Sequence, residues 1–288
     1  MPIDTGSIGR STDYFEHHVD VRWLMAYAAG LDDLNPAYMD TTAGTVHAHP
    51  IFPVCLEWPA ILAARALLGE NLSDAESARG VHAAHDLHLF RPITAGTTLR
   101  TKATLLAIEK IKPGAGYTLR LDTVDESEQL VCQTYQFGIY RDVPVIGATA
   151  PATEKPALPA TQPLDGTTTT IAVAAGSAHR YTECARIWNP IHTDRQFAQN
   201  AGLPDIILHG TATMALAVTE LTNRFVAGDP QRVVRTGGRF AATVLMPSTL
   251  ELNTSAVRQQ DDGTQLVSFV VANADAALAI NHGFFVFR

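Results

Sequence analysis

The chain has 288 residues, of which 46% are hydrophobic and 17% charged, and its net charge is −8. This length and apolar content predict one large domain or two of ordinary size, without a long disordered region. The acidic balance argues against general nucleic-acid binding, which needs a basic face, although a few local Lys or Arg side chains can still hold an anionic ligand.

The cysteines and the apolar segments exclude several other classes of protein. Cys55, Cys132 and Cys184 form no CxxC pair, which indicates neither a disulfide framework nor a zinc site and fits a reducing compartment. The N-terminus is too polar for a secretory signal, and no apolar run approaches the ~18 residues of a membrane helix. We therefore expect a cytoplasmic protein that does not bind membranes.

The chain contains an internal repeat. Tyr27 is followed by the segment 35–40, NPAYMD, and Tyr181 is followed at the same spacing by 189–194, NPIHTD, an offset of 154 residues. Between them, 144–170 is rich in proline, which predicts an extended segment outside the cores. The repeat predicts two similar halves, at 1–145 and 170–288, joined by a linker at 146–169.

Each half has the same predicted order of elements. An apolar helical stretch precedes a run of strands bounded by turn residues such as Pro113-Gly114 and Asp262-Gly263. One helix followed by antiparallel strands is an α+β pattern, which a curved sheet wrapped on one central helix satisfies. The predicted helices are 55–68 and 211–225, and the predicted strands are 98–108, 117–125, 130–140, 249–257, 265–272 and 277–287.

Several motifs resemble one enzyme family. They are Trp188-Asn189-Pro190-Ile191-His192, Ile207-Leu208-His209-Gly210 and Arg239-Phe240-Ala241 in the second half, with Ala48-His49-Pro50-Ile51-Phe52-Pro53 and 82–92 in the first. Their order and spacing resemble the MaoC-like type-2 enoyl-CoA hydratases, whose duplicated members include the hydratase part of the peroxisomal multifunctional enzyme. The resemblance spans nearly the whole chain apart from the linker, and it implies a double hot-dog fold.

The resemblance also implies which residues carry the reaction. Hydration of an enoyl thioester needs a base for water, an acid for the α carbon and donors for the enolate-like oxygen. His192 stands at the position of the family's catalytic histidine. Gly210 is expected to donate its N–H to the thioester oxygen at a helix start, and Asn189 to order the motif loop or to serve as a turn residue before proline.

The family's aspartate is missing from the second half. Five residues before His192 the chain has Ile187, which cannot transfer a proton, whereas the first half keeps Asp33 but replaces the histidine with Tyr38. Three outcomes stay open. In the first, Glu183 shares a helical face with Ile187 and supplies the acid, unless it is simply a solvated carboxylate. In the second, Asp33 meets His192 across the repeats. In the third, the protein binds acyl-CoA with little activity.

Other residues are assigned to the substrate by resemblance. His82 and Ala83 stand where the family has a His-Gly pair against CoA, and Lys110 and Lys112 flank a turn that in the family lies near a CoA phosphate or is a solvated hairpin tip. Phe240 packs on the ligand or in the core. Trp188 and His209 join the substrate site with their motifs.

The sequence therefore predicts a hydro-lyase that interconverts a 2-enoyl-CoA and a (3R)-hydroxyacyl-CoA. The alternative is a catalytically weak acyl-CoA-binding or partner subunit, because of Ile187, and thioester hydrolysis is a third possibility. The expected partner is an acyl-CoA or acyl-carrier thioester, with a homodimer possible. No cofactor and no metal are expected, since GxGxxG, GxxxxGK and Gly-x-Ser-x-Gly motifs are absent and His82, His85 and His88 alternate on a predicted strand.

Overall fold

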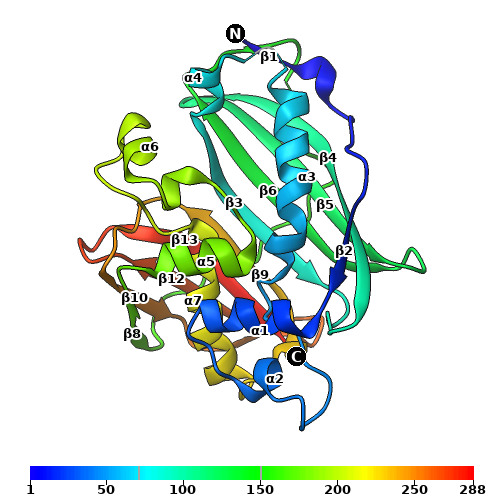
Figure 1. Ribbon diagram of the computed structural model, residues 1–288, viewed down its shortest axis with the longest axis vertical. Coiled ribbons are helices and arrows are strands. Elements are labelled where there is room, and N and C mark those ends of the chain that lie inside the picture. The colour runs from blue at the N-terminus through cyan, green and yellow to red at the C-terminus, as the bar shows by residue number, and fades with distance from the viewer. Residues whose placement is uncertain (71, 150) are drawn as a thin grey trace.

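Both halves of the chain contribute to one antiparallel sheet. The computed structural model describes residues 1–70, 72–149 and 151–288. Its large sheet has the order β2-β4-β5-β6-β3-β9-β13-β12-β10-β8, with β11 paired to β12 off this path. The first five strands come from the first repeat and the others from the second, so the predicted repeats form two halves of one sheet (Figure 1).

The strands of the large sheet differ widely in length, from two residues in β11 to 15 in β4. In the large sheet they are β2 Phe15–Val19, β3 Gly80–Leu89, β4 Thr97–Ile111, β5 Gly114–Asp125, β6 Leu130–Arg141, β8 Thr168–Val173, β9 Val233–Phe240, β10 Ser248–Thr254, β11 Arg258–Gln259, β12 Gln265–Ala272 and β13 Leu278–Phe287. A separate parallel pair joins β1 Ile3–Asp4 to β7 Val145–Ile146.

The helices include one long central helix in each repeat. The α-helices are α1 Val21–Gly30, α2 Pro36–Met39, α3 Pro53–Leu68, α4 Asp74–Ser77, α5 Ser177–Ala185, α6 Arg195–Asn200 and α7 Gly210–Phe225, and the 3-10 helices are η1 Thr5–Ser7, η2 Pro190–His192 and η3 Pro230–Arg232. None of the described helices is long and apolar enough to cross a membrane.

The central helices and the strands confirm the predicted pattern. Helices α3 and α7 correspond to the two predicted apolar helices, and α3 begins earlier than expected because proline at its first position is compatible with a helix start. Strand β12 has the predicted bounds. The β4–β5 hairpin is longer than expected, since Gly114 has φ +140 and a Cβ there would lie 2.2 Å from the Tyr140 carbonyl oxygen.

The repeat motif places two tyrosines at the centre of the molecule. Tyr27 on α1 and Tyr181 on α5 are separated by the repeat offset, and both are buried. Their hydroxyl oxygens lie 3.4 Å apart and their ring centroids 5.8 Å apart. Residues that correspond in the two repeats therefore meet each other, as a pseudo-twofold axis between the halves requires.

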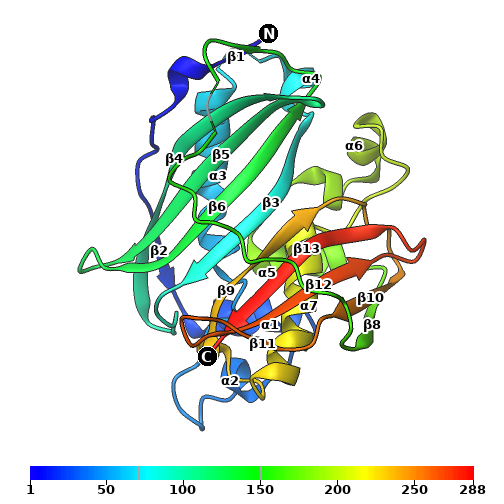
Figure 2. The same cartoon turned by 180° about the vertical axis from the view of Figure 1, so that it is seen from behind.

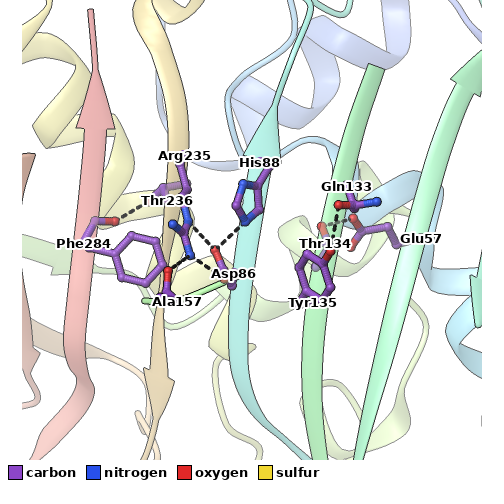
Figure 3. Close-up of polar contacts among 10 residues, drawn as sticks. All are labelled: Glu57, Asp86, His88, Gln133, Thr134, Tyr135, Ala157, Arg235, Thr236 and Phe284. Atoms are coloured by element: carbon purple, nitrogen blue, oxygen red, sulfur yellow. Dashed lines mark hydrogen bonds and ion pairs between the residues drawn. The ribbon is translucent and has the colours of Figure 1, made fainter. Parts of the chain in front are cut away.

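Strands β3 and β9 join the two halves of the sheet. On its outer side, the carboxylate of Asp86 accepts two hydrogen bonds of 2.8 Å from the guanidinium of Arg235, and His88 Nε2 lies 3.2 Å from the same carboxylate (Figure 3). Asp86 is 2% exposed. The seam between the repeats thus combines main-chain pairing with a buried ion pair.

The proline-rich linker crosses the outer face of the sheet (Figure 2). Arg235 donates to the Ala157 carbonyl at 3.0 Å, and the Gln162 N–H donates to Ser268 Oγ at 3.0 Å. These contacts hold the linker against the seam that it connects. The exact limits of the three segments stay a prediction.

Candidate active site

The Asn-Pro motif of the second repeat turns His192 into the protein. The side chain of Asn189 accepts a hydrogen bond of 3.4 Å from the Ile191 N–H, and Pro190 occupies the first position of η2. A polar cap followed by proline favours this helical turn. His192 ends the turn and is 8% exposed.

One hydrogen bond defines which nitrogen of His192 can act as a base. Nδ1 lies 2.8 Å from the carbonyl oxygen of Ile207, which can only accept, so Nδ1 carries the proton. In the neutral ring, Nε2 then bears the lone pair. Burial lowers the pKa of His192 to about 4, against a weaker opposing effect of the Ile207 carbonyl. The imidazole is therefore neutral near pH 7.

A second histidine stacks on His192. The ring centroids of His192 and His209 lie 3.6 Å apart at an interplanar angle of 23°. His209 Nε2 is 3.2 Å from Thr182 Oγ1 on α5, and burial lowers the pKa of this histidine as well. Because His209 directly precedes α7, the stack places His192 beside the start of that helix.

The start of α7 offers unpaired main-chain donors. Gly210 is its first residue, and the preceding His209 makes no side-chain cap. The first N–H groups of a helix have no partner within it, and the helix dipole favours negative charge there. A side chain at Gly210 would place a Cβ 3.0 Å from the ring of Phe240, so glycine keeps this end of the helix open.

Two strands bring three of the predicted substrate residues to the start of α7. Phe240 ends β9, and its ring lies 4.9 Å from the ring of His82 on β3 in an edge-to-face arrangement. Ala83 falls at a register shift between His82 and Ala84, a bulge that re-aims the neighbouring side chains. The structure thus gathers Gly210, Phe240, His82 and Ala83 at one junction.

Several predicted residues lie elsewhere. Glu183 and Trp188 are exposed and line a surface hollow with Asn189. Lys110 and Lys112 are exposed at the β4–β5 hairpin. Among the hydrogen bonds of the described residues, none joins Glu183 to His192.

Asp33 belongs to the first repeat's own version of the site. Its carboxylate accepts hydrogen bonds of 2.9 Å from Thr219 Oγ1 and 3.1 Å from the Asn35 N–H. Thr219 Oγ1 is also 3.1 Å from Nε2 of His49. Burial raises the pKa of Asp33. These contacts link Asp33 to His49 through the Thr219 hydroxyl. At the corresponding position of the second repeat, the buried side chain of Ile187 has no polar group.

The sequence predicted no role for His49, which lies beside a proline. In the first repeat Tyr38 and His49 occupy the places of His192 and His209, with ring centroids 5.6 Å apart. A groove lined by both repeats lies beside His49. Pro50 stands where the second repeat has Gly210, and proline has no N–H. The first repeat therefore lacks both the basic histidine and the main-chain donor, as a comparison of His49-Pro50 with His209-Gly210 could have indicated.

Comparison with known families agrees with the repeated fold. Residues 158–277 match the MaoC like domain, and residues 7–133 match the FAS1-like, dehydratase domain region. The chain has a double hot-dog fold, and its second repeat matches the MaoC like domain.

Similar proteins of known sequence share short regions with this chain. Enoyl-CoA hydratase 2, peroxisomal, of Arabidopsis thaliana is 41% identical over 63 residues, which are 22% of this chain and 20% of that protein. Enoyl-CoA hydratase ChsH3 of Mycobacterium tuberculosis is 36% identical over 84 residues, 29% of this chain and 28% of that protein. The chain thus spans about a quarter of the length of these curated relatives.

Solved structures share the fold over the whole chain. A MaoC-like dehydratase from Phytophthora capsici superposes with a TM-score of 0.84 at 19% identity, covering 99% of this chain and 97% of that one. The double hot-dog protein RV0216 of Mycobacterium tuberculosis superposes with a TM-score of 0.65 at 17% identity, covering 98% and 96%. At these identities the likeness concerns the fold alone.

Proposed function

We propose that the protein is a hydro-lyase that adds water reversibly to a 2-enoyl thioester, carried by CoA or an acyl carrier protein, to give the (3R)-3-hydroxyacyl thioester. The observation that carries this proposal is His192, whose Nδ1 is bonded to the Ile207 carbonyl and whose ring stacks on the residue that precedes Gly210. A base and a main-chain donor are thereby held next to each other in the second repeat. The enoyl-CoA hydratase names of the relatives support the same reaction.

The reaction can be balanced with His192 as the group that moves the proton. Nε2 takes a proton from water as the water oxygen bonds to C3 of the enoyl group. The electrons of the double bond move onto the thioester oxygen, and the imidazolium then returns the proton to C2. Because one ring takes and returns the proton, both parts of the water add to the same face of the double bond, and no carboxyl group is required.

The start of α7 stabilises the charge that develops on the thioester oxygen. The Gly210 N–H is the donor we assign to this oxygen, and the helix dipole acts in the same direction. His82 and Phe240 then flank the thioester end of the ligand, as their positions beside Gly210 suggest.

A second candidate function rests on Ile187. Where the family has an aspartate, this buried side chain cannot hold or activate water, and loss of one group of a proton-transfer pair commonly costs 10²–10⁴-fold, to order of magnitude. A protein that binds acyl-CoA with little turnover would fit this substitution. We assign the role of the missing aspartate to neither Glu183 nor Asp33. Glu183 is exposed to solvent, and the Asp33 carboxylate accepts a hydrogen bond from Thr219.

The test follows the absorbance of the conjugated enoyl thioester in wild type and in His192→Ala. We expect hydration by wild type and a loss of about 10²–10⁴-fold in kcat for the variant, which removes the only proton-transfer group that we assign. The matched control is His18→Ala, an exposed histidine on β2, which should keep wild-type turnover.

Each other outcome contradicts the proposal in a different way. Equal turnover by wild type and His192→Ala would remove His192 from the mechanism. Tight acyl-CoA binding without turnover by either protein would favour the second candidate function. Release of free thiol in the same assay would instead reveal thioester hydrolysis.

A further inference from the structure

The interior of the first repeat contains a row of polar side chains beneath α3. Glu57 on α3, His85 on β3, and Thr134 and Gln136 on β6 are each no more than 2% exposed. We call these four residues the polar row. Carboxyl, imidazole and amide groups are uncommon at such burial unless they are paired.

The strand geometry places these four side chains on one face of the sheet. Thr134 donates to the carboxyl group of Glu57, so it points toward α3 (Figure 3). Side chains two residues apart on a strand share a face, which turns Gln136 the same way. His85 is paired with Gln136 across β3 and β6 and is its neighbour on that face.

Most of the polar atoms in this row lack a hydrogen-bond partner within the described part of the chain. Both ring nitrogens of His85, both amide atoms of Gln136 and Oε2 of Glu57 are buried and unpaired there. Unpaired buried polar atoms are rare in native proteins, because each loses its hydrogen bonds with water on folding. The side chains that carry these five atoms lie on the face of the sheet toward α3, so one bound group there can contact several of them.

The second repeat has no such polarity at the corresponding position. Counting from His49 and His209, the place of Glu57 is taken by Ala217, which is buried on α7. At this buried position only the first repeat has a carboxyl group, and burial raises the pKa of Glu57 to about 7. The contrast between repeats shows that the fold does not require the polar row.

The polar row continues from the thioester end of the candidate site. The ring of His85 lies 5.4 Å from the ring of His82, which lies 4.9 Å from Phe240 beside Gly210. An acyl chain that starts at Gly210 and extends under α3 would therefore reach His85 and Gln136 after passing His82.

We propose that the acyl chain of the natural substrate carries a neutral oxygen group, a hydroxyl or a carbonyl, that the polar row binds several carbons beyond the reacting double bond. This inference rests on the proposed hydratase function and deepens it. Gln136 and His85 each offer a donor and an acceptor, which suits either oxygen group. A carboxylate on the substrate would be repelled by ionised Glu57.

The experiment compares pairs of 2-enoyl-CoA substrates that have equal chain length and end in either a hydroxyl or a methyl group, at several lengths. Wild type should favour the hydroxylated member of the best pair by at least about tenfold in kcat/KM, since a site built for hydrogen bonds discriminates strongly against analogues that lack them. Gln136→Met, which keeps the side chain's length without its polar atoms, should abolish or reverse this preference.

Gln133→Met is the matched control. Gln133 lies on the same strand, and its amide nitrogen donates to the Asp122 carboxylate rather than joining the polar row. Its amide oxygen accepts from the Tyr135 hydroxyl (Figure 3). This variant should keep the wild-type preference. Thermal unfolding of each variant identifies a loss of fold, and in that case Gln136→Leu and His85→Phe replace Gln136→Met.

The outcomes separate this inference from the proposed function. Hydration of both substrates by wild type with equal kcat/KM at every length would overturn the inference and leave the function standing. If neither substrate is hydrated, the proposed function fails. Calorimetric binding of the saturated hydroxyacyl-CoA and acyl-CoA to wild type then tests the inference alone, and equal affinity for both would overturn it.

Discussion

At the scale of the residue, the environment of one imidazole decides its chemistry. The Nδ1–H of His192 donates a hydrogen bond to the Ile207 carbonyl, and the ring stacks on His209. These two contacts fix the orientation of the imidazole. Burial disfavours the imidazolium, which lowers the pKa to about 4 and keeps the ring neutral over the physiological range. A histidine in this state can act as a base near neutral pH.

The pH dependence of hydration should show this low pKa. In free enzyme, kcat/KM should stay constant from neutral pH down to about pH 5 and fall as the pH drops through about 4, where His192 becomes protonated. The measurement is a pH–rate profile with an enoyl-CoA at low concentration, checked against the folded fraction at each pH. An acid limb near the ordinary histidine value of 6.5 would contradict the assignment.

Some of these residue properties were within reach of the sequence and others were not. The spacing of Asn189 and His192 relative to Asn35 and Tyr38 predicted two equivalent motifs, and the structure forms both with the same Asn cap. The tautomer of His192 could not be predicted, because the carbonyl of Ile207 belongs to a separate loop. The stack of His192 on His209 depends likewise on a tertiary contact.

At the scale of the element, the pattern of α3 shows what sequence reasoning resolves. An apolar helical stretch predicted the helix and its end, and α3 ends at Leu68 as expected. The same pattern concealed Glu57, a single acidic residue inside an apolar helix that faces inward. Which face of a helix is covered depends on the strands packed against it, and that is a property of the fold.

Glu57 should make the stability of the protein depend on pH. Its pKa is raised from 4.5 in the unfolded chain to about 7 in the fold, mainly by burial. The stabilisation is therefore full below pH 4.5 and is lost as the pH rises through 7, at a cost of about 3 kcal/mol. Glu57→Gln should remove this loss, so the variant should gain stability relative to wild type between pH 5 and pH 9.

Urea unfolding of both proteins at the two pH values measures this difference. Every other titrating group is shared by the two chains, so the change in their relative stability isolates residue 57. A difference that is the same at pH 5 and pH 9 would show that the carboxyl group keeps its ordinary pKa in the fold.

At the scale of the whole molecule, duplication produces two sites that are no longer equal. The Tyr27–Tyr181 pair lies between the two sites. The ring centroid of His49 is 5.7 Å from that of Tyr27, and the ring centroid of His209 is 4.9 Å from that of Tyr181. The second repeat keeps the histidine and the glycine, whereas the first has Tyr38 and Pro50 and adds the polar row. In the function that we propose, the second repeat carries the reaction and the first binds the acyl chain, and both roles require that β3 and β9 stay paired.

The Asp86–Arg235 ion pair should contribute strongly to holding that seam together. Burial alone would raise the pKa of Asp86, but His88 and Arg235 lower it on balance, so the carboxylate stays ionised in the fold. Arg235→Met leaves this buried charge without its main partner and should destabilise the protein by about 3–5 kcal/mol in urea unfolding. Asp86→Leu combined with Arg235→Met removes both charges and should recover most of that loss.

The exposed pair of Arg195 and Asp205 provides the control for this prediction, because its distance of 2.8 Å matches that of the seam. Arg195 is 70% exposed at its side chain, so Arg195→Met should change the stability little.

Since the sheet is continuous through β3 and β9, the Arg235→Met protein should still unfold in one transition. Equal effects of the two single substitutions would show that burial at the seam adds nothing to the pair, and two separate transitions would show that the repeats fold independently.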